Sequence, residues 1–161
     1  MNHRIGFGFD VHPLGEHTGL CIGGLIVPHH KGTLGHSDGD VLIHSICDAL
    51  LGAANLRDIG YHFPDSDPEY RGIDSKILLA RTMKLLQDNR YRLVNVDVTI
   101  VLQRPKISEY VPEMKKILSS VMNIPVEDIS IKATTTEKLG FIGQEEGIAS
   151  YAVALLEKMP S

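Results

Sequence analysis

The sequence predicts an α/β fold, an α+β sandwich in which a mixed β-sheet carries helices packed on one side. Apolar residues recur at every second position in some segments and with the helical period in others. This mixture of periods indicates strands and helices stacked in layers. The chain has 161 residues and a hydrophobic fraction of 43%. That length supports one core but would be cramped for two, so we expect a single domain over residues 1–161.

The first strand is expected at residues 4–12, where "GFGFDVHP" alternates glycine with apolar residues until Pro13 ends the run. Side chains alternate between the two faces of a strand. One face carries Phe7, Phe9 and Val11, and we expect it to face the core. The other face carries Gly6, Gly8, Asp10 and His12. Because glycine packs nothing in a strand, this bare face indicates that another backbone or a ligand comes close.

A hairpin is expected around residues 20–28, because "GGLIVP" joins turn glycines to a β-branched run. A helix is expected at 38–53, with Ser37 as its N-cap and with Asp38 and Asp40 in the first turn, where the helix dipole favours negative charge. The apolar stripe of this helix comprises Ile43, Ile46, Cys47, Leu50 and Leu51. A second stripe, with residues four apart, comprises Asp40, His44 and Asp48, and taken alone it favours a solvated face.

The remaining elements follow the same two periods. Residues 54–73 are expected to be irregular. Helices are expected at 75–89 and 108–122, and strands at 91–103 and 129–135, with a glycine-containing loop after the second strand. The valine-rich alternation of "LVNVDVTIVLQ" is the clearest strand pattern of the chain. The segment 147–157 is ambiguous, because alanine and leucine favour a helix while its position after a loop suits a strand. We assign it as a strand.

Charge and composition exclude several functions. The chain carries 16 basic and 20 acidic residues, a net charge of -4, and no basic run longer than a pair, which argues against nucleic-acid binding. No apolar run approaches the roughly 18 residues of a membrane span, and no targeting segment is visible. Cys21 and Cys47 lack CxxC spacing, so we expect both to fill the core of a reduced, cytoplasmic protein. If such an acidic protein binds a phosphate compound, it needs metal ions to neutralise the ligand.

Asp10 and His12 place two zinc-capable ligands on one strand face, and His44 offers a third from a helix. One carboxylate and two imidazoles with an open fourth position is the composition of a catalytic zinc site. Spacing alone leaves the alternative that Asp10 caps a turn and that His12 lies on the surface. Four other histidines are expected to be exposed and without partners, namely His3, His17, His29 and His30.

Two further stretches carry polar groups. "FPDSDP" places Asp65 and Asp67 between prolines, either as a plain turn or as a rigid loop that holds a hydroxylated ligand. "KATTTEKLGF" presents three threonines, Glu137 and Lys138 after a strand. The threonines are common strand residues, but the same groups also suit anionic ligands and Mg²⁺. Walker A, GxGxxG, HExxH and GxSxG motifs are absent from the sequence.

Taken in order and spacing, "GFGFDVH", "GHSDGDVLIH", "DIGYHFPDSDP" and "IKATTTEKLGFIG" resemble the family of 2-C-methyl-D-erythritol 2,4-cyclodiphosphate synthases over residues 4–157. The resemblance implies a homotrimer with active sites at subunit interfaces. It also implies a lyase of the non-mevalonate isoprenoid pathway. The reaction converts 4-diphosphocytidyl-2-C-methyl-D-erythritol 2-phosphate to 2-C-methyl-D-erythritol 2,4-cyclodiphosphate and CMP by metal-assisted intramolecular phosphoryl transfer.

The resemblance also implies residue roles. Asp10, His12 and His44 would hold one Zn²⁺ per subunit, and Glu137 would hold Mg²⁺ or Mn²⁺ against the diphosphate. His36 and Thr135 would position the transferring phosphates. Substrate contacts near the zinc site would come from Asp10, His12, His36 and Ser37. Contacts to the sugar and methylerythritol groups would come from Asp58, Ile59, Gly60, Phe63, Pro64, Asp65, Ser66 and Asp67. Contacts to the cytidine diphosphate would come from Leu102, Gln103, Arg104, Pro105, Lys106, Ile107, Ser108, Ala133, Thr134, Thr135, Thr136, Glu137 and Phe141.

The chain departs from the family pattern at Gln144, where members often carry an arginine near the threefold axis. We therefore expect weak binding of isoprenoid diphosphates in the central cavity of the trimer. Two hypotheses from other classes remain open. A metal-dependent hydrolase of small phosphate esters would release free phosphate, and a non-catalytic cytidine-nucleotide-binding module would bind CMP without turnover.

Overall fold

A five-stranded mixed β-sheet forms the centre of the protein in a computed structural model that describes residues 2–16 and 19–160. The strands lie in the order β4 (Lys31–Thr33), β1 (His3–Glu16), β7 (Gly147–Lys158), β5 (Tyr91–Val101) and β6 (Ile129–Thr134). Strands β5 and β6 are parallel, and the other neighbours pair antiparallel. Strands β2 (Leu20–Ile22) and β3 (Leu25–Val27) form the expected hairpin apart from this sheet.

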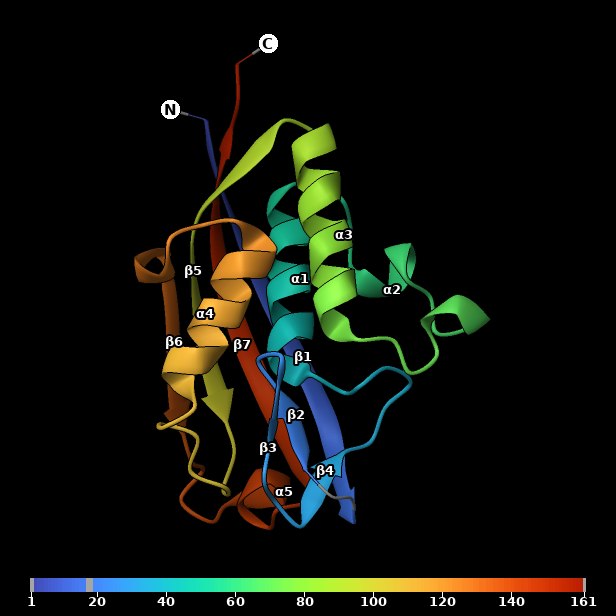
Figure 1. Cartoon of the computed structure of the whole chain (residues 1–161), viewed down its shortest axis with the longest axis vertical. Helices are drawn as coiled ribbons and strands as arrows, with labels where there is room; N and C mark the ends of the chain where they lie inside the picture. Colours follow the sequence, from blue (N-terminus) through green and yellow to red (C-terminus); the bar gives the residue numbers. More distant parts are fainter. Residues whose placement is uncertain (1, 17–18, 161) are drawn as a thin grey trace.

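Three long helices lie over the sheet on one side, α1 (Val41–Ala53), α3 (Ser75–Asp88) and α4 (Val111–Met122) (Figure 1). The shorter turns are α2 (Ile59–His62), α5 (Gly140–Gly143) and two 3-10 turns, Pro68–Tyr70 and Val126–Asp128. Among the residues that the structure describes, no helix is long and apolar enough to cross a membrane. The expected α+β fold with a mixed sheet is confirmed, and the ambiguous segment 147–157 is a strand.

Helix α1 starts later than the sequence predicts. It begins at Val41, and its N-cap is Asp40, whose carboxylate accepts a hydrogen bond from the Ile43 N–H at 3.0 Å. The predicted N-cap Ser37 and the placement of Asp38 in the first turn are therefore wrong. Gly39 adopts a positive φ of +74°, so the chain turns sharply just before the helix instead of already forming part of it.

The two faces of β1 are reversed relative to the prediction. Phe7, Phe9 and Val11 do not face the core; they are 64%, 44% and 41% exposed on the side away from the helices. The glycine face packs against the backbone of α1 instead. A Cβ atom at Gly6 would lie 1.8 Å from the Ala49 carbonyl oxygen, and one at Gly8 would lie 1.9 Å from the Ser45 carbonyl oxygen. The expected close approach of another backbone is thus confirmed.

The core lies between α1 and the sheet. The predicted apolar stripe of this helix is completely buried, comprising Ile43, Ile46, Cys47, Leu50 and Leu51. Cys21 is buried as well, and both cysteines are free thiols, as expected. The predicted solvated face of the helix is wrong, because Asp40 is completely buried and His44 is only 8% exposed. The Asp40 carboxylate also accepts hydrogen bonds from the N–H groups of Gly23 and Gly24, which ties the β2–β3 hairpin to the helix.

Four histidines were expected to be exposed and without partners. His3 is exposed on β1, whereas His17 lies outside the described residues. His29 and His30 follow β3, and a donor atom of each lies within 4.8 Å of a donor atom of Glu145. His30 is exposed, as predicted, whereas His29 is only partly exposed. Two segments far apart in the sequence therefore meet at this point.

Candidate active site

The close packing of α1 on β1 creates the candidate metal centre. Asp10 and His12 project from the helix-facing side of β1, and His44 projects from the first turn of α1. Because the glycines of β1 carry no side chain, the helix backbone lies against the strand, and the three side chains can meet. The three residues form a group of potential metal ligands, as the sequence predicted.

The donor atoms of this group form a compact triangle. Oδ2 of Asp10 lies 2.9 Å from Nε2 of His12 and 3.0 Å from Nδ1 of His44. The two ring nitrogens are 3.1 Å apart. A tetrahedral zinc ion with bonds of about 2.0–2.1 Å separates its ligand atoms by about 3.3 Å. The triangle therefore fits a zinc-sized ion after movements of a few tenths of an ångström, and it leaves one coordination position free.

The electrostatics of the triangle favour an anionic, metal-binding carboxylate. Burial of Asp10 works to raise its pKa, but hydrogen bonds and charges from His12 and His44 outweigh that effect and lower the pKa to about 2. Burial likewise works to lower the pKa of His12, but the hydrogen bond with Asp10 outweighs it and raises the pKa. The carboxylate is thus ionised at neutral pH, and protons compete with a metal mainly at the imidazole.

A second set of contacts fixes the ring of His44. Nε2 of His44 lies 2.8 Å from Oγ of Ser75 and 3.2 Å from Oγ of Ser37. Ser75 is completely buried, and its hydroxyl donates to Asp38 while its backbone N–H donates to the same carboxylate. This chain of hydrogen bonds directs Nδ1 of His44 toward Asp10. Sequence reasoning missed Ser75 and Asp38 here, because neither stands at metal-ligand spacing from a predicted ligand.

A cavity of about 300 Å³ opens beside the triangle. Its walls contain many residues predicted to contact the substrate, namely Asp10, His12, His36, Ser37, Ile59, Gly60, Phe63 and Asp65. Four predicted residues of the neighbouring segment are not among the lining residues, namely Asp58, Pro64, Ser66 and Asp67. Asp58 instead caps α2, and Asp67 caps the turn Pro68–Tyr70. Four lining residues were not predicted, namely Gly35, Tyr70, Ile73 and Leu78.

A separate pocket of about 180 Å³ gathers the predicted cytidine-binding residues. It is lined by Leu102, Gln103, Pro105, Lys106, Ile107, Ser108, Ala133, Thr134 and Thr135. Four residues predicted for this group are not among the lining residues, namely Arg104, Thr136, Glu137 and Phe141. Glu137 lies close by, because its carboxylate accepts a hydrogen bond from the hydroxyl of Thr135 at 3.1 Å. The segment after β6 thus places Glu137 next to a residue that lines this pocket.

The two pockets lie far apart within one chain. Asp10 pairs with Ser150, Ser150 with Ile100, and Ile100 with Ala133 across neighbouring strands. Three strand spacings therefore separate the metal triangle from the second pocket, or about 14 Å at about 4.8 Å each. Two metal ions that act on one phosphoryl group typically lie about 3.5–4 Å apart. Glu137 and the triangle of the same chain do not form a single two-metal site.

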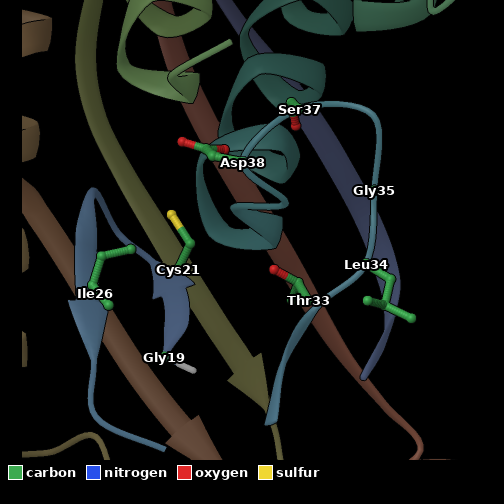
Figure 2. Close-up of a pocket in the computed structure, with 8 residues that line it drawn as sticks. All are labelled: Gly19, Cys21, Ile26, Thr33, Leu34, Gly35, Ser37 and Asp38. Carbon is green, nitrogen blue, oxygen red and sulfur yellow. The ribbon is translucent and has the colours of Figure 1, made fainter. Parts of the chain in front are cut away.

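A third cavity, of about 490 Å³, is lined in part by Leu34, Gly35, Ser37 and Asp38. Figure 2 shows Cys21 and Ile26 of the β2–β3 hairpin on one side of it and Thr33 and Leu34 on the other. It shares Gly35 and Ser37 with the cavity beside the triangle. Ser37 is the only one of its lining residues that the sequence predicted for the active site.

Fold and site together define a small α+β protein with a preformed group of potential metal ligands, one carboxylate and two imidazoles, which is the donor set of a catalytic zinc site. The chain belongs to the YgbB family, whose model matches residues 3–157.

Similar proteins agree with this family. A 2-C-methyl-D-erythritol 2,4-cyclodiphosphate synthase of Porphyromonas gingivalis is 63% identical over 153 residues, which are 95% of this chain and 94% of the relative. The bifunctional IspDF of Campylobacter jejuni matches with a TM-score of 0.94 and 38% identity over 98% of this chain, but over only 42% of its own chain. The IspF–CDP complex of Plasmodium falciparum matches with a TM-score of 0.86 and 36% identity over 99% of this chain and 98% of its own.

Proposed function

We infer that this chain catalyses the cyclodiphosphate synthase reaction of the non-mevalonate isoprenoid pathway. The substrate is 4-diphosphocytidyl-2-C-methyl-D-erythritol 2-phosphate, and the products are 2-C-methyl-D-erythritol 2,4-cyclodiphosphate and CMP. The observation that carries the proposal is the triangle of Asp10, His12 and His44 in a chain of the YgbB family. The reaction class is that of a phosphorus–oxygen lyase, and the two free cysteines suit a reducing cytoplasm.

The chemistry requires little acid–base catalysis from the protein. An oxygen of the 2-phosphate forms a bond to the β-phosphorus, while the bond from that phosphorus to the bridging oxygen breaks, and CMP leaves with this oxygen. The attacking phosphate is already an anion at neutral pH. The protein must therefore align the two oxygens and neutralise the charge between them. Metal ions held by this chain's carboxylate and imidazole ligands would supply that neutralisation by withdrawing charge from the phosphate oxygens.

We assign the roles of individual residues as follows. Asp10, His12 and His44 hold Zn²⁺, and Glu137 holds Mg²⁺ or Mn²⁺ beside the diphosphate. His36, in the wall of the metal cavity, and Thr135, in the wall of the second pocket, orient the transferring phosphate groups. The loop residues Ile59, Gly60 and Asp65 contact the methylerythritol part. The second pocket holds the cytidine, which needs mostly backbone contacts and a shape that fits a flat base.

A homotrimer completes the site. The two pockets of one chain are too far apart to act on one diphosphate, so we assign the second pocket of each site to a neighbouring subunit. The outward face of the sheet supports this assembly, because Phe7, Phe9, Tyr151 and Val153 form an exposed apolar surface. Ile5 extends it and is 74% exposed. Such a contiguous apolar surface marks an interaction site rather than a solvated face.

Subunit mixing tests this assignment directly. His12→Ala removes a metal ligand from one pocket, and Glu137→Gln removes the second-metal ligand from the other. Each variant alone should be inactive. When the two variants are unfolded, mixed in equal amounts and refolded, about a quarter of the sites should contain an intact pocket from each neighbour. As a control, the refolded mixtures should regain the wild-type circular dichroism, and their His12-containing subunits should regain their zinc. If such mixtures are inactive, both pockets of a site lie in one chain.

The phosphorus NMR spectrum separates the three hypotheses for the reaction. The wild-type protein, incubated with the diphosphocytidyl substrate and Mg²⁺, should produce the resonances of a cyclic diphosphate together with CMP. Free phosphate would identify a hydrolase, because a metal-bound water would then be the nucleophile. Persistence of the substrate, with CMP binding detected separately, would identify a nucleotide-binding module.

A further inference from the structure

A second group of potential metal ligands lies outside the active site. One donor atom of each of His29, His30 and Glu145 lies within 4.8 Å of the others. The two histidines precede β4, and Glu145 precedes β7. Both segments are joined to β1, because β4 pairs with its last residues and because the Leu14 N–H donates to the Glu146 carbonyl at 2.9 Å. None of the three residues lines the cavity beside the metal triangle.

The backbone holds these side chains in place. The N–H of Glu145 donates to the Ile142 carbonyl at 3.0 Å, and Nζ of Lys31 donates to the Glu145 carbonyl at 2.7 Å. The carbonyl of His29 accepts a hydrogen bond from the Gly19 N–H at 3.0 Å. The rings of His29 and His30 lie with their centroids 4.3 Å apart. The group is therefore presented by two loops whose backbones are held by hydrogen bonds.

One nitrogen of this group lacks a partner. Nε2 of His29 is shielded from solvent and makes no hydrogen bond with the described residues. A shielded polar atom without a partner costs free energy, and a bound cation would supply the missing interaction.

We propose that His29, His30 and Glu145 bind a divalent transition-metal ion such as Zn²⁺ at a second site on each chain. Two imidazole nitrogens and one carboxylate oxygen suit Zn²⁺, Ni²⁺ and Cu²⁺, whereas Mg²⁺ and Ca²⁺ take oxygen ligands. Three protein ligands leave the remaining coordination positions to water. The second site shares no residue with the triangle of Asp10, His12 and His44 and does not depend on the proposed reaction.

Two neighbouring cations decide how tightly this site binds. Nε of Arg104 lies 3.9 Å from Oε1 of Glu145, and its side chain is 75% exposed, so it can move away from the carboxylate. The ammonium group of Lys31 stays near, because it binds the Glu145 backbone. Both charges repel a metal ion, so the second site binds more weakly than the triangle. Removal of the Arg104 charge should strengthen it.

Metal stoichiometry tests the proposal. The untagged full-length chain, purified with its active-site metal, is dialysed against micromolar Zn²⁺ at pH 7.5, and bound zinc is measured by elemental analysis. The wild type should hold two equivalents per chain. The double variant His29→Asn/His30→Asn and the single variant Glu145→Gln should each hold one. His3→Asn, a matched control on an exposed histidine, should hold two. Arg104→Ala should fill the second site at a lower zinc concentration.

The remaining outcomes are equally decisive. His44→Ala should lose the active-site equivalent and keep the other, which shows that the two sites are independent. A wild type that holds one equivalent at every zinc concentration that keeps the protein soluble would overturn the second site. Two equivalents in the folded double variant would overturn it as well. Catalytic turnover of that double variant should equal that of the wild type, so a failure of this proposal leaves the proposed function untouched.

Discussion

The substitution Ser75→Ala should weaken metal binding without touching a metal ligand. The hydroxyl of Ser75 lies 2.8 Å from Nε2 of His44, on the side of the ring opposite the nitrogen that faces Asp10. It also donates a hydrogen bond to Asp38, which holds the hydroxyl in place. When Nδ1 of His44 ligates a metal, Nε2 carries the proton and donates a hydrogen bond to Ser75 Oγ. Alanine removes the only acceptor within 3 Å that the described residues offer to this proton.

The magnitude follows from comparable hydrogen bonds at metal sites. Loss of a partner that orients a ligating histidine costs about 10–100-fold in metal affinity. That range corresponds to about 1.4–2.7 kcal/mol. Asp38 remains bonded to the Ser75 backbone N–H in the variant, so the loop before α1 should keep its position. The fold should therefore survive, and the loss should appear in the affinity for zinc.

Competition of the protein with a zinc-binding dye at pH 7.5 measures this affinity. Ser45→Ala is the matched control, because Ser45 is also a completely buried serine but bonds to Ser150 instead of a metal ligand. The control should bind zinc as the wild type does. If the zinc affinity of Ser75→Ala is within a factor of two of the wild-type affinity, the Ser75 hydroxyl does not orient His44 for metal binding.

Three further predictions concern acid, packing and assembly. Zinc affinity should fall as the pH drops from 8 to 5.5, because a protonated His12 ring cannot ligate zinc. Burial works to lower the pKa of His12, but the neighbouring Asp10 carboxylate outweighs this effect and raises the pKa. An affinity independent of pH, measured with the same dye, would contradict this. Gly8→Ala should destabilise the fold by about 1–3 kcal/mol because it forces α1 away from β1. Gly52→Ala, with nothing within 4 Å of the added Cβ, should instead stabilise the helix by about 0.5–1 kcal/mol, and chemical denaturation compares the two. Phe7→Glu should convert the proposed trimer to single chains in light scattering, whereas the control Ile77→Glu, on an exposed helix position, should not. A trimer in both variants would remove the apolar face from the interface.

The sequence predicts most of the elements well, because they depend on local patterns. The helical and strand periods locate α3 and β5 within a few residues, whereas β7 was assigned from its position after a loop. Spacing alone leaves the metal interpretation of Asp10, His12 and His44 open, and the resemblance of four motifs to a known family favours it; the structure brings the three side chains together. The start of α1 is harder to predict, because Ser37 and Asp40 are both good N-caps. The positive φ of Gly39 decides between them, and a propensity argument does not include it.

The errors share one physical cause, namely that burial depends on what packs against each face. Phe7 was assigned to the core because it is apolar, and Asp40 to a solvated face because it is charged. The structure buries Asp40 because three backbone N–H groups satisfy its carboxylate. The position of Ser75 beside His44 also depends on tertiary packing, since 31 residues separate them. Such contacts cannot be derived from the pattern of a single segment.

The glycines of β1 link the metal centre to the assembly. Gly6 and Gly8 let the α1 backbone lie directly against the strand, which brings His44 to Asp10. The same contact leaves no room for larger side chains on the helix-facing side of the strand. Apolar residues between the glycines must therefore point to the opposite face, where a single chain leaves them in water. Association of chains through that face would remove the exposed apolar surface from water. In the proposed trimer, the same association completes the active site. One alternating strand thus positions the candidate metal ligands and also presents the apolar face that the proposed trimer covers.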